Sequence, residues 1–567
     1  MNQTEADAAF AQAIDFQQSG QLAEARVLYE QILEAFPTYL HVPHLLGVIV
    51  SQQGDWFLAR RLIETSLLLQ ASDPDALANL AWVLVNLGLH DKALARCDQA
   101  IALSPGHARA HLTRGMALRM ASRFEPAVEA FEQALALKPD LVEALNYRGQ
   151  CLHSLGRYDE ALQTYDFALH MQPANADVWN NRGASLTLLD RHEEGAASFR
   201  RALELQPAFP EALFNHGLAL QQARRFDEAL AHYDEALRLR PNYPEALMHR
   251  AFALQALRRS PHDCVASLDR ALHLRPGFFE ALNGRANVLG QMEQYAEALE
   301  NYQEALRIKP DFHEALINQG HALRELGRLD EAAQSYREAL RCGGDAQAGL
   351  FALAAMGREA APPVAPPDYI VSLFDRYADR FDEHLVGKLQ YQAHERLYEA
   401  LLPLAGPGAR DILDLGCGTG LCAPLLQPLA RSLVGVDLSP GMLEAARRRG
   451  LYTELVCRDV TEFLQQQAQP FDLVVSTDVF IYIGDLQPVF DGVRRCLRDG
   501  GLFGFSIEAS DGQDFLLQPT RRYAQSPDYI RRLAAQHGLQ VLHLSPTVIR
   551  KEHGADTAGF IAVLKAG

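Results

Sequence analysis

The sequence predicts an α + α/β protein, with an N-terminal all-α repeat array followed by an α/β domain that has an open, mostly parallel sheet. Three observations support this prediction. Small residues recur every 34 positions over residues 6–346, which is the period of a two-helix repeat. An apolar run ends in a glycine-rich turn at residues 416–420, and the next apolar run ends at Asp437. A proline-rich stretch, residues 360–367, separates the two regions and predicts a short semi-rigid linker.

The repeat units share small residues and a closing proline. One small position is held by Gly47, Ala81, Gly115, Gly149, Gly183, Gly217, Ala251, Ala286 and Gly320. Small side chains let two helices approach closely, and proline ends a helix because it lacks the N–H and clashes with the preceding turn. These marks resemble the tetratricopeptide repeat, a pair of antiparallel helices. About ten repeats are expected over residues 6–346.

Two-helix units cannot bury their apolar faces alone, so we expect them to stack into a right-handed superhelix with a long concave groove. One unit is a residue longer around residues 260–262, which predicts a lengthened turn. Residues 347–367 are assigned to a capping helix and the linker. Asp345 is expected at the N-cap of that helix, because its side chain can accept hydrogen bonds from the first free amides.

Asparagines occupy one shared position on the first helix of several units, namely Asn79, Asn181, Asn215 and Asn318. A side-chain amide both donates and accepts hydrogen bonds. The position therefore resembles the ladder with which related arrays bind a peptide backbone, which implies a protein or peptide partner in the groove. The alternative is a solvated helix face.

Arginines follow at the next position, where the repeat signature usually has leucine. They are Arg114, Arg148, Arg182, Arg250 and Arg285. A row of arginines could bind an acidic partner. The favoured interpretation is that their stems lie along apolar surface while their heads pair with Glu or Asp of a neighbouring unit.

The glycine-rich turn of the second region combines Asp414 with Gly416, Gly418 and Gly420. Glycines let the backbone approach a ligand where a Cβ would collide. Asp437 follows about twenty residues later, at the expected end of the next strand, where a carboxylate can accept both hydroxyl hydrogens of a ribose. The sequence thus predicts a nucleoside site at the carboxyl edge of the sheet.

The order of motifs resembles the class I S-adenosylmethionine (SAM) methyltransferases over residues 368–567. Residues 437–443 resemble the ribose-binding loop, residues 470–479 the fourth strand, and residues 373–382 the lid helix. Asp459 stands where this family bonds the adenine amino group. The resemblance implies a seven-stranded Rossmann-like sheet that binds SAM through Asp414, Gly416, Gly418, Gly420, Asp437 and Asp459. Asp437 and Asp459 could instead be ordinary solvated turn carboxylates, and Asp414 could simply bond backbone amides of its own turn.

The end of the sheet is predicted from the same resemblance. Residues 511–525 are expected to be irregular, and a helix should follow over residues 528–537. The last two strands are expected at residues 539–544 and 560–565 as an antiparallel pair.

The methyl acceptor should lie beyond the fourth strand, where Asp478 and Tyr482 are the catalytic candidates. A general base is needed only if the acceptor carries a proton at neutral pH. Asp478 could receive such a proton, or could cap a helix or bond the cofactor. Tyr482 could equally be a wall of the pocket. Tyr391 could close over the cofactor or simply pack, and Glu508 could face the pocket from the fifth strand.

Composition limits the class of partner. The chain has 567 residues and a net charge of −18, which argues against a nucleic-acid substrate because phosphate backbones would be repelled. The eight cysteines include no Cys-x-x-Cys pair, so no metal site or disulfide framework is expected. No run reaches the roughly 18 apolar residues of a membrane span. A cytoplasmic protein is expected.

These patterns favour one function over three others. The favoured function is a SAM-dependent methyltransferase whose array recruits a protein substrate or partner. The main alternative is a repeat scaffold whose methyltransferase-like domain binds ligand without turnover. The two-residue glycine spacing disfavours a nicotinamide-dependent oxidoreductase. A sugar transferase is disfavoured because about 200 residues after the linker are too few for two domains.

Overall fold

The computed structural model describes residues 1–375, 378, 381–406, 408–467, 469–552 and 555–567. The chain divides into two compact units, Met1–Gly284 and Arg285–Gly567, and each is described by itself. The lid expected over residues 373–382 lies partly outside the described residues, because residues 376, 377, 379 and 380 are not among them.

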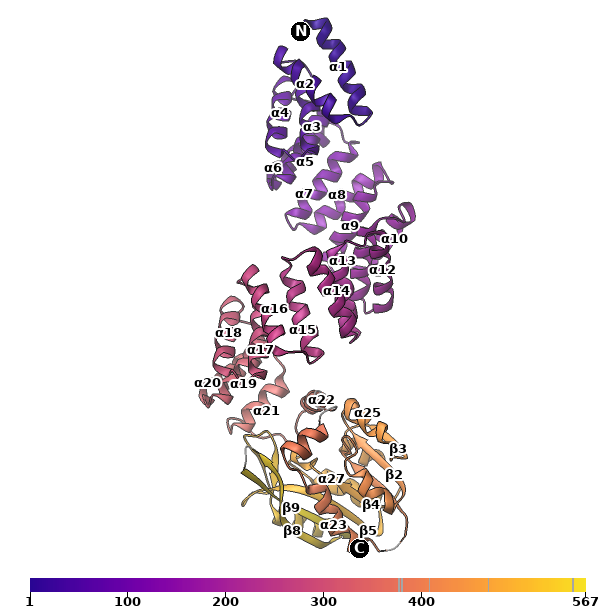
Figure 1. Cartoon of the computed structure of the whole chain (residues 1–567), viewed down its shortest axis with the longest axis vertical. Helices are drawn as coiled ribbons and strands as arrows, with labels where there is room; N and C mark the ends of the chain where they lie inside the picture. Colours follow the sequence, from indigo (N-terminus) through magenta and orange to yellow (C-terminus); the bar gives the residue numbers. More distant parts are fainter. Residues whose placement is uncertain (376–377, 379–380, 407, 468, 553–554) are drawn as a thin grey trace. The chain divides into compact units, whose positions relative to one another are not determined.

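The first unit is a succession of paired helices (Figure 1). Their bounds are α1 (Gln3–Gln18), α2 (Leu22–Ala35), α3 (Val42–Gln52), α4 (Trp56–Leu69), α5 (Pro74–Asn86), α6 (His90–Leu103), α7 (Ala108–Met120), α8 (Phe124–Leu137), α9 (Val142–Ser154), α10 (Tyr158–Met171), α11 (Ala176–Leu188), α12 (His192–Leu205), α13 (Pro210–Gln222), α14 (Phe226–Leu239), α15 (Pro244–Ala256) and α16 (Pro261–Leu274). The predicted longer turn is confirmed, because four residues separate α15 from α16 where three separate α13 from α14.

The repeated glycines are explained by the side chain that faces them from the second helix of the same pair. A Cβ built on Gly149 would lie 2.3 Å from the ring of Tyr165, and one on Gly183 would lie 2.7 Å from the ring of Phe199. Gly115, Gly217 and Gly320 face an aromatic ring in the same way. The close approach predicted from small residues is therefore present, and the facing aromatic ring accounts for glycine at these positions.

The arginines of the first unit pair with acids of the preceding repeat, which confirms the favoured interpretation. The ion pairs are Arg114–Asp98 (2.9 Å), Arg148–Glu132 (2.8 Å), Arg182–Asp166 (2.7 Å) and Arg250–Asp234 (2.6 Å). Arg182 also donates to Ser198 Oγ of its own repeat at 2.8 Å. Each such arginine is a rung that joins two successive repeats.

The second unit begins inside α17 (Phe279–Gln291) and continues the helix pairs before the sheet. Its next helices are α18 (Tyr295–Ile308), α19 (His313–Glu325), α20 (Leu329–Arg341) and α21 (Ala346–Ala355). Asp345 caps α21 as predicted, accepting from the amides of Gln347 and Ala348 at 2.9 and 3.2 Å. In all, α1–α20 make ten pairs within the described residues, as the repeat count predicts.

The sheet has the order β3-β2-β1-β4-β5-β7-β6, with β9 paired to β5 and β8 paired to β9. Its strands are β1 (Arg410–Leu415), β2 (Ala430–Asp437), β3 (Glu454–Cys457), β4 (Phe471–Ser476), β5 (Leu497–Ala509), β6 (Phe515–Leu517), β7 (Tyr523–Gln525), β8 (Leu539–Glu552) and β9 (Ala555–Ala566). Strands β1–β5 are parallel, and β8 and β9 are the predicted antiparallel end. Two features differ from the prediction: residues 511–525 contain the hairpin β6–β7, and β8 and β9 are longer than expected.

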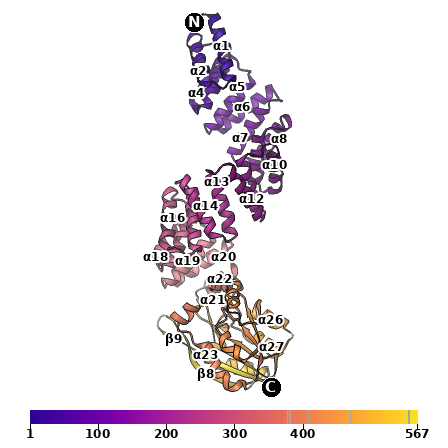
Figure 2. The same ribbon diagram turned by 45° about the vertical axis from the view of Figure 1, so that its right-hand side comes forward.

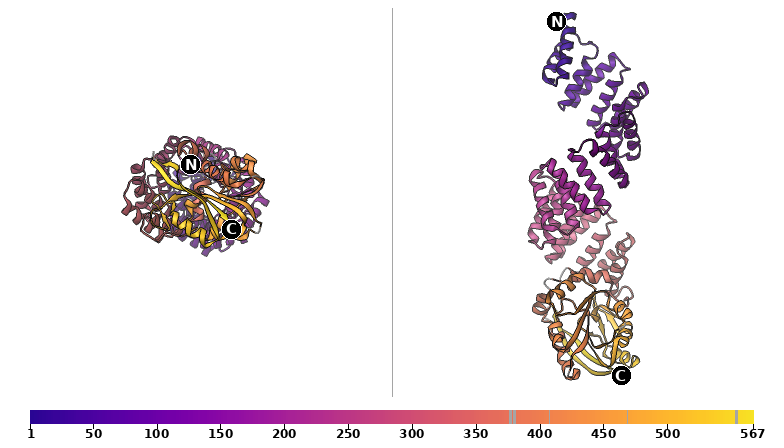
Figure 3. Two further views of the ribbon diagram at one scale, coloured as in Figure 1. Left: turned by 90° about the horizontal axis from the view of Figure 1, so that it is seen from below. Right: turned by 90° about the vertical axis from the view of Figure 1, so that its right-hand side faces the viewer.

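Helices cover both faces of this sheet (Figures 2 and 3). Successive residues of a strand point to opposite faces. In β4, Leu473 and Val475 pack with α23 (Ala393–Ala405) and α24 (Ala423–Leu426), whereas Val474 packs with α26 (Val460–Gln466), α27 (Gln487–Cys496) and α28 (Pro527–Gln536). Helix α25 (Pro440–Arg449) contacts β2 and β3.

The linker binds the sheet domain through its backbone. The Ala365 N–H donates to the Tyr482 carbonyl at 2.9 Å, and the Gly484 N–H donates to the Pro363 carbonyl at 2.8 Å. The Tyr523 hydroxyl donates to the Pro362 carbonyl at 2.5 Å. Beyond the linker, α22 (Pro367–Asp375) begins the cover of the sheet edge. The linker is therefore part of the structure around the fourth strand.

Candidate functional site

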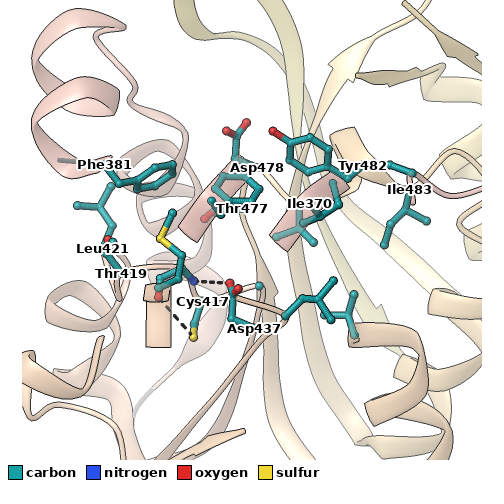
Figure 4. Close-up of a pocket in the computed structure, with 18 of the residues that line it drawn as sticks. Ile370, Phe381, Cys417, Thr419, Leu421, Asp437, Thr477, Asp478, Tyr482 and Ile483 are labelled. Atoms are coloured by element: carbon teal, nitrogen blue, oxygen red, sulfur yellow. Dashed lines mark hydrogen bonds between the residues drawn. The ribbon is translucent and has the colours of Figure 1, made fainter. Parts of the chain in front are cut away.

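A cavity with about 980 Å³ of empty space, part of it open to solvent, lies at the carboxyl ends of β1, β2, β3 and β4. The strand order reverses between β1 and β4, and ligands bind at such a point in open α/β sheets. The turn after β1 and the strand ends form its floor, while residues of the linker and α22 cover it. Figure 4 shows Cys417, Thr419 and Asp437 at one end and Asp478 and Tyr482 at the other.

The glycine-rich turn needs glycine for two separate reasons. Gly416, Gly418 and Gly420 have φ of +67°, +54° and +81°, in the left-handed region that disfavours side chains. In addition, a Cβ on Gly416 would lie 2.2 Å from Val479 Cγ2. Gly416 and Gly418 line the cavity, whereas Gly420 turns toward Tyr452 and does not.

Asp437 lies at the end of β2 and faces the cavity with a carboxylate held by backbone amides. Its Oδ2 accepts from the Gly418 N–H at 2.8 Å, and its Oδ1 accepts from the Ser439 N–H at 2.9 Å. Burial raises the pKa of Asp437, and these amides partly offset that rise. A carboxylate has about four lone-pair sites, so acceptor capacity remains for a ligand in the cavity.

Asp414 is placed elsewhere by the structure. It is buried beneath the turn, is not among the residues that line the cavity, and accepts a hydrogen bond from the Tyr452 hydroxyl at 2.7 Å. Burial raises the pKa of Asp414 to about 7, against the opposing effect of the Tyr452 hydrogen bond. Its role here is to hold the turn from below.

Asp459 caps a helix and also faces the cavity. Its side chain caps α26 by accepting from the amides of Thr461 (2.8 Å) and Glu462 (3.1 Å). It also lines the cavity at the end of β3, which is the position expected for contact with an adenine.

Asp478 and Tyr482 lie beyond β4, at the other end of the cavity. Asp478 has a φ of +60°, its N–H donates to Ser506 Oγ at 3.0 Å, and its Oδ1 accepts from Arg550 Nη1 at 2.6 Å. Burial raises the pKa of Tyr482, whose ring stands edge-on to Phe374 with ring centroids 5.5 Å apart. The structure therefore brings both candidates to one place.

Known proteins match this region of the chain. The methyltransferase-domain family matches residues 412–501. A malonyl-[acyl-carrier protein] O-methyltransferase from Enterobacter lignolyticus is 31% identical over 175 residues, which cover 31% of this chain and 67% of the relative. The chain belongs to the methyltransferase family.

A second relative, the malonyl-[acyl-carrier protein] O-methyltransferase of Acetivibrio thermocellus, is 34% identical over 138 residues, or 24% of this chain and 47% of that protein. The chain spans about half or less of the first three relatives it matches, namely 47%, 33% and 32% of their lengths. The match thus concerns the methyltransferase domain and leaves the repeat array outside it.

The tetratricopeptide-repeat family matches residues 44–108, 112–176, 155–212 and 283–347, and a further family of that description matches residues 210–243. Among solved structures, the chain is similar to YrrB, described as a TPR protein with an unusual peptide-binding site. The identity is 21% and the TM-score 0.29, and the match covers 33% of this chain and 97% of that one. Within the described residues, no helix combines the length and apolar character that a bilayer crossing requires.

Arg550 and Glu508 are two residues near the cavity whose place the sequence did not predict. Arg550 lies on β8, more than seventy residues after Asp478, and nothing in the surrounding sequence connects the two. Glu508 does not line the cavity; it is buried and paired with Arg550. In the sequence Arg550 begins a charged run with Lys551 and Glu552, which gave no sign that it would be a buried cation with partners.

Three asparagines of the ladder form hydrogen bonds within the repeat array. Asn79 Nδ2 donates to His44 Nε2 (2.8 Å), Asn181 Nδ2 to Asn146 Oδ1 (2.9 Å) and Asn215 Nδ2 to Asn180 Oδ1 (2.9 Å), each on the preceding repeat. Asn318 occupies the same position on α19. Asn79 and Asn181 also line surface hollows, the first beside Trp56, Trp82 and Arg109.

Proposed function

We propose that the methyltransferase domain binds SAM in this cavity and transfers its methyl group to an acceptor, while the repeat array recruits a protein partner or substrate. The observation that carries the proposal is the placement of Asp437. Its carboxylate is held by two backbone amides beside a glycine turn and retains acceptor capacity toward the cavity. A ribose with two adjacent hydroxyls suits that arrangement.

The residues present fit SAM. Asp437 would hold the ribose, the Gly416–Gly418 turn would let the ligand approach the backbone, and Asp459 would face the adenine end. The aspartates that line the cavity also suit a cationic ligand. When bound, SAM supplies a methyl group already activated on a sulfonium sulfur, so the chain mainly has to orient the acceptor and exclude water.

The apolar cover is the part of the site that would exclude water. Val364 and Ala365 of the linker and Ile370 and Phe374 of α22 line the cavity opposite the strand ends. Aligning two reactants in such a site can contribute on the order of 7–11 kcal/mol in favourable cases. Both relatives described above are named as O-methyltransferases, which supports an oxygen atom as the acceptor.

Isothermal titration of the full chain with SAM tests the cofactor. Asp437→Ala should weaken SAM binding at least about 100-fold, because hydrogen bonds to a charged group contribute roughly 1.5–3 kcal/mol each and two are lost. Asp499→Ala is the matched control, since the side chain of Asp499 is 86% exposed and lies away from the cavity. Equal SAM affinity in the Asp437→Ala protein would contradict the proposed pose.

Transfer of label from tritiated SAM to a cell lysate tests turnover and the role of the array together. We expect labelled product, and we expect Asn79→Ala combined with Asn181→Ala to lower the labelling of protein about tenfold without changing SAM affinity. Asn242→Ala, in an exposed loop, is the control. Binding of SAM without product in any lysate would favour a non-catalytic scaffold, and undiminished protein labelling would contradict recruitment through the ladder.

A further inference from the structure

Arg550 is among the largest fully buried side chains of the described chain, and it donates to Asp478, which lines the cavity. Only 1% of its side chain is exposed, and it pairs with two carboxylates, Asp478 and Glu508. The register of β8 against β9 shifts between Val548 and Arg550, so Ile549 is the extra residue of a β-bulge. Bulges redirect side chains next to active sites. Here Ile549 packs in the core with α23, while Arg550 reaches Asp478.

Asp478 is held in one geometry from three directions. Its backbone is in the left-handed region, its N–H is bound by Ser506, and its Oδ1 is bound by Arg550. Non-glycine residues persist in that region only where the surroundings impose it, and such residues cluster at functional sites. With 17% of its side chain exposed, Asp478 still reaches the cavity that it lines.

Tyr391 supplies a second, independent observation at the same place. It lines the cavity and is 3% exposed, yet its buried hydroxyl has no hydrogen-bond partner at bonding geometry within the described residues. A buried hydroxyl without a partner costs about 1–3 kcal/mol. Burial, followed by the nearby charge of Asp478, holds the pKa of Tyr391 well above its usual value, against a smaller opposing effect of Thr477, so its phenol stays a donor. Thr477 is close to this hydroxyl but does not satisfy it at bonding geometry, so the hydroxyl can donate to a ligand in the cavity.

We propose that Asp478 and Tyr391 bind the acceptor, that Arg550 is the positioning residue for Asp478, and that the acceptor group is a neutral hydroxyl on an otherwise apolar compound. This rests on the proposed function and adds the class of acceptor. The rest of the acceptor should be apolar, because the cavity walls there include Ile370 and Ile483.

A hydroxyl satisfies both side chains at once. It donates its hydrogen to the Asp478 carboxylate and accepts the Tyr391 hydrogen on one lone pair, which leaves its other lone pair for the methyl carbon. As the new carbon–oxygen bond forms, the carbon–sulfur bond of the sulfonium breaks, the sulfur keeps that electron pair, and the hydroxyl proton passes to Asp478. A neutral amine has a single lone pair, which the methyl carbon requires. A carboxylate acceptor would place a second negative charge beside Asp478.

Probe binding tests the class of acceptor without relying on activity. The full chain is saturated with S-adenosylhomocysteine and titrated by calorimetry at about pH 8 with 4-methylphenol or with 4-methylbenzoate. A phenol has a pKa of about 10 and is neutral there, whereas the benzoate is an anion of similar shape. We expect 4-methylphenol to bind at least about tenfold more tightly. Tighter or equal binding of 4-methylbenzoate, or no binding of either probe, would overturn the proposal.

Substitutions test the separate roles of Asp478, Tyr391 and Arg550. Asp478→Asn should reduce the preference for 4-methylphenol to less than about threefold, and Tyr391→Phe should weaken 4-methylphenol about tenfold. The controls are Asp499→Asn and Tyr398→Phe, the latter half-buried on α23. Arg550→Gln should lose the preference as Asp478→Asn does, and Arg550→Lys should recover most of it. If Arg550→Gln does not fold, Arg550→Lys and Asp478→Asn decide, and an unchanged preference in Asp478→Asn contradicts the assignment.

The chemistry of the product gives an independent reading, and SAM affinity separates the two proposals. A methyl ether survives mild base, whereas a methyl ester releases labelled methanol. We expect label from tritiated SAM to remain non-volatile after base. Release as methanol would overturn the hydroxyl acceptor while leaving the methyltransferase proposal intact. A chain that does not bind SAM would instead contradict the proposed function itself.

Discussion

The repeat array and the methyltransferase domain both pair polar side chains, but they distribute the pairs differently. In the first unit of the array, one rung is repeated with small changes: an arginine, an acid of the preceding repeat and a hydroxyl of its own repeat, as at Arg182. In the methyltransferase domain, Asp414, Asp437 and Arg550 each have a different environment and occur once.

The two regions differ in whether the contribution of a side chain to stability is repeated elsewhere in the structure. Each arginine–acid pair stabilises one interface between neighbouring repeats. Removing one pair therefore leaves the similar pairs at the other interfaces of the array in place. A single group in the sheet domain has no copy, and burial perturbs it strongly. The regions should therefore respond in opposite ways to pH and unequally to substitution.

The largest expected effect concerns Asp414. Its pKa of about 7, against an ordinary 3.8, means that the folded domain binds more protons than the unfolded chain between these values. Its stabilising contribution is therefore present below about pH 4 and is lost as pH rises through about 7, by about 4 kcal/mol at about 1.4 kcal/mol per pKa unit. Asp414→Asn should remove this dependence, as measured by hydrogen exchange of the β1 amides from about pH 5 to 8. The same pH dependence in wild type and variant would contradict the burial of a carboxyl here; Asp499→Asn is the control.

The stability of the array should change with pH in the opposite direction. Burial lowers the pKa of His249 to about 4, so the folded array resists a proton that the unfolded chain takes up near 6.5. Stability is present above about pH 6.5 and falls by about 3 kcal/mol as pH drops to about 4, at about 1.4 kcal/mol per pKa unit. His249→Phe, among the aromatic side chains of Phe214, Tyr233 and Phe252, should lessen that loss. The exposed His262→Phe should not, in acid titrations followed by circular dichroism.

A smaller effect is expected from one methyl group in a helix pair of the array. Gly149→Ala should destabilise by about 1–2 kcal/mol, because the overlap with Tyr165 outweighs the gain in helix propensity. Gly106→Ala is the matched substitution with no atom within 4 Å of the new Cβ, and it should be neutral or slightly stabilising. Thermal unfolding of the two variants measures the comparison, and equal midpoints would show that Tyr165 yields without cost.

The smallest expected effect tests whether each arginine–acid pair contributes only a small part of the stability of the array. Arg182→Ala should cost about 1 kcal/mol or less, since it removes a partly exposed ion pair and one hydrogen bond to Ser198. Arg201→Ala, which removes only an exposed pair with Glu204 one turn away, should have almost no effect. If Arg182→Ala lowers the free energy of unfolding in urea by several kcal/mol, a single pair dominates the stability of the array, and the repeated pairs are not equivalent.

Sequence patterns that repeat or that occupy adjacent positions were sufficient for much of the fold. The 34-residue period specified the helix pairs, because each pair repeats the same local contacts. Asp345 as a helix cap and Asp437 beside the glycine turn followed from short-range rules about amides and strand ends. The hairpin β6–β7 was missed because three-residue strands carry almost no periodic signal.

The sequence by itself determined the two-region architecture, the glycine turn and the approximate edge of the sheet where a ligand would lie. Only the tertiary structure decided which carboxylates face the cavity. Asp437 lines the cavity, whereas Asp414, just before Gly416 in the same motif, lies beneath the turn and accepts from Tyr452. The physical reason is that a carboxylate at a strand end is directed by the donors packed around it, and the Tyr452 hydroxyl comes from 38 residues further along the chain. The same holds for Arg550, which reaches Asp478 across 72 residues of sequence that carry no sign of the pairing.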